Sequence, residues 1–480
     1  MIDFSINFMN IFIKKLLGFS IGPIAGALIA FITIPLTTYF VSPSEYGKAS
    51  MFSLFQVLIV TVIYLGMDQA YTREYHESNN KINLLKNAML IPILLSLFLF
   101  LVICLNLDTV SLFLFGETGY KVASLLFGAT IISMTIERFI LHSIRMEEKA
   151  LEFSIVNILI KFTILVCTII FVSMIRRDFL AVVYSTAIGQ LIGDIYLSIR
   201  YKKYLNYFNF KFDKKLCTKL LKFGLPLIIA ASISNLLNSL DRIALRTWSN
   251  FEQIGIFTAA LKVSATLQII QTSFTSFWVP TAYRWYNQKK EIKHFEMVSK
   301  VLLLVMSIIF GLILIFKDLI TVLLSNQYMD SKYIIGLLCI QPIMYTISET
   351  TTLGIVFSKK SYLNISVSLI AILPNIILNI LLVPKFGAIG AGISTGVAYI
   401  FFFFARSFYS NKNWVGFELK NHFWLTGIMF IAAIINTIDT NYIELFNILI
   451  LLLLILIQIP TIKTFIYIIK NKNDKEWDFS

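Results

Sequence analysis

The sequence predicts an all-α polytopic membrane protein with about fourteen transmembrane helices. They would form two pseudo-repeated six-helix lobes followed by two further helices. The 480 residues are 57% hydrophobic and only 14% charged, whereas a soluble domain carries roughly 25% charged residues. Apolar runs long enough for a hydrocarbon core of roughly 30 Å recur along the whole chain. Stretches in one half also resemble stretches in the other half, in the same order.

The predicted spans are apolar runs separated by short polar segments, with boundaries uncertain by several residues. They cover about residues 16–41, 49–67, 84–106, 119–141, 152–175, 179–199, 220–244, 254–279, 299–325, 333–357, 362–383, 387–409, 422–438 and 443–468.

The first lobe, residues 1–205, contains spans one to six, and several of these carry ionisable side chains. Lys161 lies inside span five, and Asp68 and Asp194 lie within or near spans. A charge at the centre of a membrane helix costs at least roughly 2.5–3.5 kcal/mol, so it usually faces protein or a water-filled cavity. We therefore treat these residues as candidates for a functional site or for charge pairing.

A basic and aromatic linker, residues 206–218, separates the two lobes. It belongs to the stretch 200–222, in which eight Lys or Arg residues alternate with Tyr and Phe. This composition also occurs in nucleic-acid-binding segments. Between two membrane spans it is more typical of a segment that lies on an anionic leaflet, so we expect no nucleic-acid partner and contacts with membrane lipids.

The second lobe, residues 219–410, begins with two spans that carry polar side chains. Asn235, Asn238 and Asp241 follow at i, i+3 and i+6, so they share one face of the predicted helix. Arg242 lies beside them, and Lys262 lies within the next span. We interpret this stripe as the wall of a hydrated cavity. The alternative is that Asp241 and Arg242 lie near a helix end and extend to the interface.

The last segment, residues 411–480, contains spans thirteen and fourteen and a basic tail. These spans lie outside the repeat, and the sequence predicts no function for them.

The distribution of charge predicts that both termini are cytoplasmic. With this orientation most of the 41 Lys and Arg residues fall on the cytoplasmic side, as the positive-inside rule requires. The formal charge of +14 would then orient the protein in its membrane.

The sequence shows no motif for catalysis or metal binding. Its four cysteines and four histidines show neither paired nor metal-ligand spacing. No Walker loop occurs, and no nucleophile, base and orienting group form a recognisable set. We therefore expect no catalytic residues, no metal site and no cofactor, with a proton or sodium gradient as the candidate driving force.

The two halves show a weak internal repeat. The stretches LLGF, EYGKA and EKALEFS at 16–19, 45–49 and 148–154 correspond to LLKF, QIGIF and KKSYLNI at 220–223, 253–257 and 359–365. A repeat of six spans keeps its orientation because six is even. Such a repeat builds a two-lobed transporter, with its site expected between the lobes.

Several stretches together resemble one known family. They are FGLPLIIAASISNLLNSLDRIAL, IGIFTAALKVSATLQII, FWVP at 277–280, LNILLVPKFGAIGAGIST at 378–395, SPSEYG at 42–47 and GMDQAYTRE at 66–74. These resemble polysaccharide exporters of the MOP flippase superfamily, which includes the MATE transporters, and are most similar to Wzx-type O-antigen flippases. The resemblance covers nearly the whole chain.

The resemblance implies transport of an undecaprenyl-pyrophosphate-linked oligosaccharide from the cytoplasmic to the periplasmic leaflet of a bacterial inner membrane, by alternating access. A polysaccharide polymerase and a chain-length regulator would be possible partners. Cations in a cavity would attract the pyrophosphate. The candidate substrate-binding residues are Arg242, Lys262, Lys161, Asn235 and Asn238, with Arg73 and Arg138 at the cytoplasmic mouth; the candidates for ion coupling or charge pairing are Asp241, Glu349, Asp194 and Asp68.

Two alternatives stay open. One is a flippase for the lipid-linked peptidoglycan precursor, and the other is a cation-coupled multidrug exporter of the same superfamily. A drug exporter would favour an acidic cavity, whereas this chain has at least as many candidate cations as acids within its spans. The short predicted outer turns disfavour a polymerase or ligase.

Overall fold

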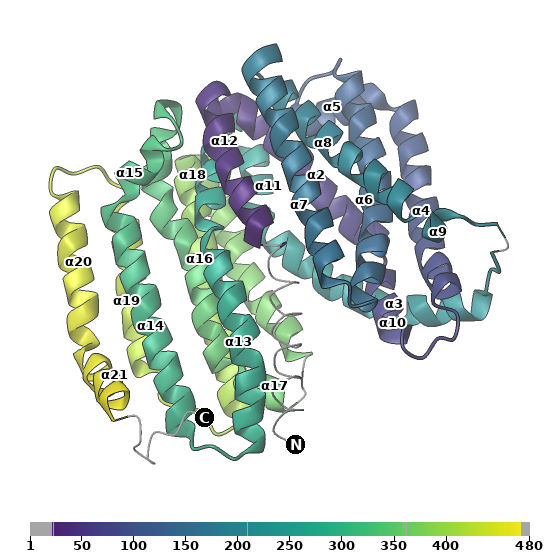
Figure 1. Ribbon diagram of the computed structural model, residues 1–480. Helices are drawn as coiled ribbons and strands as arrows, with labels where there is room; N and C mark the ends of the chain where they lie inside the picture. The colour runs from purple at the N-terminus through teal and green to yellow at the C-terminus, as the bar shows by residue number, and fades with distance from the viewer. Residues whose placement is uncertain (1–21, 23, 209, 359, 361, 472–480) are drawn as a thin grey trace. The chain divides into compact units, whose positions relative to one another are not determined.

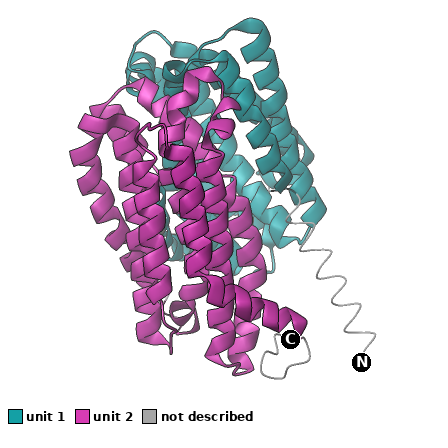
Figure 2. Ribbon diagram, turned by 90° about the vertical axis from the view of Figure 1, so that its left-hand side faces the viewer, with its two compact units in different colours: residues 1–236 teal, residues 237–480 magenta. Residues whose placement is uncertain are grey.

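The protein is built from helices joined by short turns (Figure 1). The structure, a computed structural model, describes residues 22, 24–208, 210–358, 360 and 362–471, and none of them lies in a β-strand. The all-α prediction is thus confirmed. The chain divides into two compact units, Met1–Leu236 and Leu237–Ser480, which Figure 2 colours separately.

The first unit consists of long apolar helices with short helices between them. A helix satisfies its own backbone hydrogen bonds, which is why apolar runs of this length form helices in lipid. After a helix at Ile24–Phe40, its elements are α2 (Pro43–Ile63), α3 (Met67–Glu74), α4 (Lys81–Leu105), α5 (Leu107–Phe115), α6 (Lys121–Met146), α7 (Ala150–Thr168), a π-helical turn (Ile169–Ile175), α8 (Phe179–Arg200), α9 (Lys202–Leu205) and α10 (Lys214–Leu237).

Polar side chains mark where several of these helices begin. Asn80 accepts a hydrogen bond from the backbone N–H of Asn83 at the start of α4, and Asp178 accepts one from Ala181 at the start of α8. Such caps satisfy backbone donors that have no partner inside the helix. Polar residues between the apolar runs therefore help to start helices.

Small residues allow close packing within the first unit. A Cβ atom added to Gly189 or Gly193 of α8 would lie within 3 Å of Ile164 or Ile160 of α7. Membrane helices associate through such small residues because lipid leaves them little hydrophobic driving force. The neighbouring core is filled by fully buried side chains such as Tyr71, from α3.

The second unit is organised around α16 (Lys332–Thr351), which lies against helices α12, α13, α14, α18 and α19. Its other elements are α11 (Leu240–Trp248), α12 (Phe251–Ser264), α13 (Leu267–Asn287), α14 (Ile292–Ile315), α15 (Lys317–Val322), a 3-10 turn (Asn326–Ser331), α17 (Leu353–Phe357), α18 (Leu363–Asn413), α19 (Lys420–Ile435), α20 (Ile443–Ile457) and α21 (Ile459–Lys470).

The helix α18 covers two predicted spans and reverses direction inside its range. Gly387 has φ +51°, a conformation that favours glycine. Beyond it, a Cβ atom on Gly390 would lie 2.6 Å from the carbonyl oxygen of Leu382. The two halves of α18 therefore pack against each other as two helices, as the predicted spans 362–383 and 387–409 require.

Predicted span seven was wrong as a continuous helix. The helix α10 ends at Leu237, a turn follows at Asn238 and Ser239, and α11 begins at Leu240. The inference that Asn235, Asn238 and Asp241 share one helix face fails with it, because that face exists only while the helix continues.

The helix α10 packs with the first unit, whereas the sequence division assigned residues from 219 onward to the second lobe. Specific contacts account for this. The side chain of Asn235 donates a 2.9 Å hydrogen bond to Thr61 of α2, and Lys219 pairs with Glu74 of α3.

Within the described residues, nine helices are long and apolar enough to cross a membrane. The pair α20 and α21, bent by 57°, would make a tenth crossing, and Ile24–Phe40 and α19 are shorter apolar helices. Each predicted span has a helix at its position, although the start of the first span lies outside the described residues. The count of fourteen membrane crossings stays a prediction.

Candidate functional site

A buried carboxylate at Asp241 is the most completely surrounded of the candidate residues in the second unit. It lies in the first turn of α11 and is 4% exposed. Its Oδ1 accepts hydrogen bonds from the amides of Asn375 (3.1 Å) and Asn379 (2.9 Å), and its Oδ2 accepts one from the hydroxyl of Thr395 (2.6 Å). All three partners lie in α18, on the two sides of its reversal at Gly387.

This cluster has the chemistry of a site for a small hard cation. Carboxylate, amide and hydroxyl oxygens are the ligands that such cations take. Asn379 also holds a buried Oδ1 atom that has no hydrogen-bond partner, and a buried polar atom is costly without one. Asp241 supplies carboxylate oxygens and Thr395 a hydroxyl oxygen, whereas Asn375 and Asn379 donate to Asp241 through nitrogen and would offer oxygen ligands only after their amides turn.

The sequence identified Asp241 but missed its partners. Asn375 and Asn379 stand at i and i+4 in an otherwise apolar run, so they share a helix face. Two amides on one face of a membrane helix are the signal that would have identified them, because each must find a partner.

The neighbouring candidate Asn238 lies in the turn between α10 and α11 and is exposed. Its Oδ1 accepts hydrogen bonds from the hydroxyl of Tyr399 (2.6 Å) and from the amide of Gln341 (3.1 Å). Gln341 also donates to the Tyr399 oxygen at 3.0 Å. This second polar group joins the turn to α16 and α18.

The candidate cations of the second unit lie on consecutive elements. Arg242 is half-buried in α11, next to Asp241, and Lys262 is exposed in α12. Lys262 thus presents a charge on the surface of a helix that belongs to an apolar span.

Glu349 pairs with a residue that the sequence analysis did not consider. Its Oε1 accepts a 2.8 Å hydrogen bond from Nη1 of Arg406, which also donates to the hydroxyl of Ser348. The Arg406 guanidinium lies 5.1 Å from the ring centre of Tyr345 and 5.4 Å from that of Phe402. Glu349 is thus a partner in a buried ion pair between α16 and α18.

In the first unit, Asp68 and Arg138 form an ion pair. Oδ2 of Asp68, on α3, accepts hydrogen bonds from Nε (2.9 Å) and Nη2 (2.8 Å) of Arg138, on α6. His142 lies 3.6 Å from the same oxygen and contacts Thr72. Asp68 is nearly fully buried, whereas the Arg138 side chain is 41% exposed. The pair connects the short helix α3 to α6.

Asp194 belongs to a second acidic group of the first unit. The amide of Gln190 donates to Asp194 at 2.9 Å and to Glu137 at 2.8 Å. The other carboxylate oxygen of Asp194 is buried without a hydrogen-bond partner. One amide therefore connects two carboxylates, of which the sequence analysis named only Asp194.

The other two candidate cations of the first unit, Lys161 and Arg73, are both exposed. Lys161 lies in α7, and its side chain passes near Gly26. Arg73 lies at the end of α3, with its guanidinium 4.3 Å from the ring centre of Phe223. Asp68 and Asp194 lie in this unit as well, whereas Arg242, Lys262, Asp241 and Glu349 lie in the other.

At the predicted outer ends of the second unit's helices, ion pairs hold the turns. Asp439, between α19 and α20, accepts a hydrogen bond from Tyr333 (3.0 Å) and pairs with Lys332 (3.4 Å). The Tyr333 hydrogen bond and the Lys332 charge lower the pKa of Asp439. Among the described residues, no group of three His, Cys, Asp or Glu side chains is placed to hold a metal ion.

The amino-acid sequence matches one family model and two relatives. The model of the family described as "Polysaccharide biosynthesis protein" matches residues 12–285. The probable low-salt glycan biosynthesis flippase Agl15 of Haloferax volcanii is 20% identical over 30% of this chain and 32% of its own length. An uncharacterized membrane protein of Methanocaldococcus jannaschii is 26% identical over 47% of this chain and 48% of its own length. The chain thus matches half or less of these two relatives.

Solved structures match over a larger part of the chain. The lipid II flippase MurJ, in an inward closed conformation, gives a TM-score of 0.69 with 18% identity and covers 96% of this chain and 99% of its own. An inward-facing MATE multidrug transporter of the MOP superfamily gives 0.59 with 14% identity, covering 80% of this chain and 94% of its own. At these identities the likeness shows the fold, which is that of MOP superfamily flippases and transporters.

Proposed function

The chain belongs to the polysaccharide biosynthesis protein family, and from this premise we propose that it is a flippase for a lipid-linked oligosaccharide. Its cargo would be an undecaprenyl-pyrophosphate-linked repeat unit of a surface polysaccharide such as O-antigen. Transport would run from the cytoplasmic to the periplasmic leaflet of a bacterial inner membrane. The single observation that carries the proposal is the family match over residues 12–285.

The residues offer the electrostatics that such a cargo requires. A pyrophosphate is an anion, and cationic side chains bind it through charge-assisted hydrogen bonds. Lys161 and Lys262 are exposed charges on helices that are otherwise apolar, and Arg242 is half-buried one residue from Asp241. A charge kept in a membrane helix marks a substrate or ion pathway more often than a structural accident. We assign the head group of the cargo to Arg242 and Lys262 of the second unit, and Lys161 of the first unit is a weaker candidate.

For the energy source, the Asp241 cluster supports coupling to a small cation. Asp241, Asn375, Asn379 and Thr395 would hold the ion, and its charge would offset that of the buried carboxylate. The hydrogen-bond partners of Asp241 are two amides and one hydroxyl. Sodium could bind the carboxylate of Asp241 and the hydroxyl oxygen of Thr395, and the two amides would turn their oxygens toward the ion. The two carboxylates joined by Gln190 are the better candidates for a proton.

Deletion of the gene tests the cargo. We expect viable cells that lose surface polysaccharide and accumulate the lipid-linked repeat unit on the cytoplasmic face of the membrane, with both effects reversed by the wild-type gene. Surface polysaccharide is measured on gels, and the lipid-linked intermediate by mass spectrometry of extracted lipids.

The same experiment distinguishes the nearest rival, a flippase for the peptidoglycan precursor. Loss of viability with accumulated peptidoglycan precursor, and with normal polysaccharide intermediates before lysis, would point to that rival. Sensitivity to cationic drugs with normal surface polysaccharide would instead point to a multidrug exporter.

A further inference from the structure

Two adjoining pockets between α14 and α21 form one amphipathic groove. We propose that it binds an anionic glycerophospholipid from the bilayer, with an acyl chain in the apolar pocket and the phosphate in the polar pocket. The occupant would be a resident lipid rather than the transported cargo, so the inference goes beyond the proposed function. It also assigns a role to the last helix pair.

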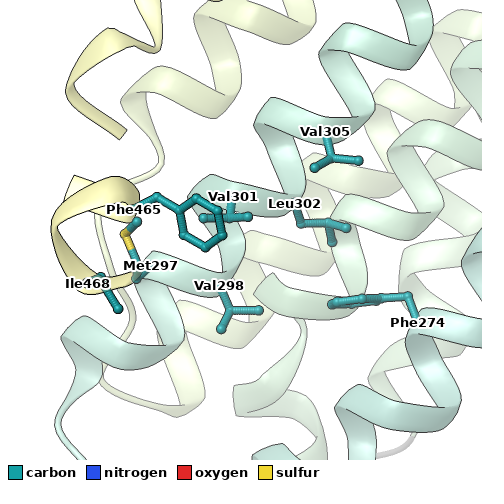
Figure 3. Close-up of a pocket in the computed structure, with 8 residues that line it drawn as sticks. All are labelled: Phe274, Met297, Val298, Val301, Leu302, Val305, Phe465 and Ile468. Atoms are coloured by element: carbon teal, nitrogen blue, oxygen red, sulfur yellow. The ribbon is translucent and has the colours of Figure 1, made fainter. Parts of the chain in front are cut away.

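The apolar pocket has a volume of about 380 Å³ and only hydrophobic residues in its wall. Figure 3 shows side chains of α21 opposite a row of side chains from α14, with one residue from α13. The five residues of α14 stand at i, i+1, i+4, i+5 and i+8, as expected for one helix face. The wall consists of Phe274, Met297, Val298, Val301, Leu302, Val305, Phe465 and Ile468.

The polar pocket adjoins this one and shares Met297 with it. It has a volume of about 150 Å³. Two lysines, an amide and two hydroxyls can contact an anion there, namely Lys293, Lys300, Asn421, Thr461 and Thr464; Glu296 and Pro460 complete the wall.

The start of α21 adds to the positive potential of the polar pocket. The chain bends by 57° between α20 and α21, and Pro460 stands in the first turn of α21. A helix N-terminus carries positive partial charge and attracts phosphate groups. Pro460 and Thr461, both in the pocket wall, place this end of α21 at the proposed phosphate.

Both lysines are exposed enough to leave the carboxylates with which they pair and to bind a phosphate. Lys300 pairs with Glu296 at 2.7 Å, and Lys293 pairs with Glu291 at 3.0 Å. The lysine side chains are 34% and 30% exposed, and Glu291 is 70% exposed. Such accessible ion pairs contribute little to stability. A phosphate can therefore bind the two lysines, and Glu296 is the main carboxylate that competes with it.

The dimensions favour a phospholipid over the cargo. A volume of about 150 Å³ corresponds to roughly five water molecules at about 30 Å³ each, which suits a phosphate group, whereas the sugars of an oligosaccharide would have to extend outside the pocket. From Met297 to Val305 the helix α14 rises by about 12 Å. One leaflet of the hydrocarbon core is about 15 Å deep, so the apolar wall has the depth of one leaflet.

Native mass spectrometry of the purified, delipidated full chain tests the proposal, with phosphatidylglycerol, phosphatidylcholine and diacylglycerol as probes. We expect one tight site for phosphatidylglycerol, and the double variant Lys293→Gln, Lys300→Gln should weaken it by about fivefold per lysine. Glu296→Gln should strengthen binding, because it removes the competing carboxylate. A purely structural role of the ion pairs predicts no such gain.

Two further variants complete the design. Lys463→Gln removes an exposed lysine of α21 that does not line the pocket, and it should bind phosphatidylglycerol as the wild type does. Val301→Trp fills the apolar pocket and should abolish retention of all three lipids. Equal binding of the three lipids to the wild type, or equal loss in Lys463→Gln and the double variant, would overturn the proposal. Copurification of a polyprenyl phosphate in the groove, in place of phospholipid, would overturn the choice of occupant.

Discussion

At the scale of single residues, the buried carboxylate of Asp241 gives a direct test of sodium binding. Its carboxylate is buried among hydrogen-bond donors of α18, and a buried charge needs compensation. A bound sodium ion would supply it, and a ligand that binds only the folded state raises stability by RT ln(1 + [L]/Kd).

We therefore expect sodium to raise the melting temperature of the purified wild-type protein relative to potassium at equal ionic strength. At a concentration a hundred times Kd the gain would be about 2.7 kcal/mol. Asp241→Asn should fold, since an amide fits the same space, but should lose this sodium effect. Thermal unfolding in detergent measures both. A sodium shift that persists in Asp241→Asn would remove the ion from this cluster.

The cations Arg242 and Lys262 give a second prediction. Replacement of either by Ala should lower surface polysaccharide about tenfold or more at normal membrane protein level, since a hydrogen bond to a charged group contributes roughly 1.5–3 kcal/mol. Arg242→Lys should be intermediate, because it keeps the charge but loses the bidentate geometry.

Polysaccharide and membrane protein level are compared in the same cells. If the two residues were only structural, the protein itself would be depleted. Normal polysaccharide from a stable Arg242→Ala, Lys262→Ala double variant would exclude both residues from the site.

The sequence revealed single charged residues but not their partners. Asp68 and Arg138 were both identified, yet only the structure shows that they bond to each other. Arg406 and Asn379 were missed, although one is a charge near the end of predicted span 387–409 and the other shares a helix face with Asn375; their bonds to Glu349 and Asp241 appear only in the structure. A charge in an apolar run is visible by itself, whereas a partner becomes recognisable only when the helices are packed.

At the scale of elements, the crossing of α10 with the segment between α2 and α3 leaves no room for a side chain. Gly66 has φ +66°, and a Cβ atom there would lie 2.3 Å from the carbonyl oxygen of Gly224. A Cβ on Gly224 would lie 2.4 Å from the carbonyl oxygen of Leu65. The obstacle is backbone, which cannot rotate away as a side chain can.

We expect Gly224→Ala to destabilise the protein by about 1–3 kcal/mol, the usual cost of overpacking. Gly427→Ala is a matched control, because a Cβ on this helical glycine would meet nothing within 4 Å. It should leave stability unchanged or raise it by up to about 1 kcal/mol. Thermal unfolding of both variants is measured in the same detergent. Equal melting temperatures for wild type and Gly224→Ala would show that α10 and the segment between α2 and α3 separate readily.

Helices were predictable from the length of the apolar runs. Breaks were predictable only where a polar segment separates two such runs. The reversal at Gly387 follows Pro384 and Lys385 and was expected between two spans. The break after Leu237 falls at Asn238 and Ser239, which favour helix ends, but the apolar residues on both sides of them concealed it. There the tertiary contacts of Asn235 and Asp241, on either side of the turn, accompany the break.

At the scale of the whole molecule, the order of apolar and polar segments predicted the fold class without any knowledge of the contacts. Within the described residues, each predicted span has one or more helices at its position. The family resemblance was confirmed by the match over residues 12–285 and by the likeness to MOP superfamily folds. The proposed cargo is less predictable, because a sugar would be recognised by a few side chains whose spacing the sequence does not reveal.

Reporter fusions can test the predicted topology. If fourteen crossings alternate from a cytoplasmic N-terminus, the linker that holds Asn206 and the turn that holds Lys289 lie in the cytoplasm, and the turn at Asp439 lies in the periplasm. The positive-inside rule supports this orientation, since Lys202, Lys203 and Lys290 would be cytoplasmic. Fusions of alkaline phosphatase, which is active outside the cytoplasm, should therefore be inactive at Asn206 and Lys289 and active at Asp439.

Fluorescent-protein fusions at the same sites should show the opposite pattern. Alkaline phosphatase activity at Asn206 would invert the orientation, and equal signals at Lys289 and Asp439 would change the number of crossings between them from odd to even.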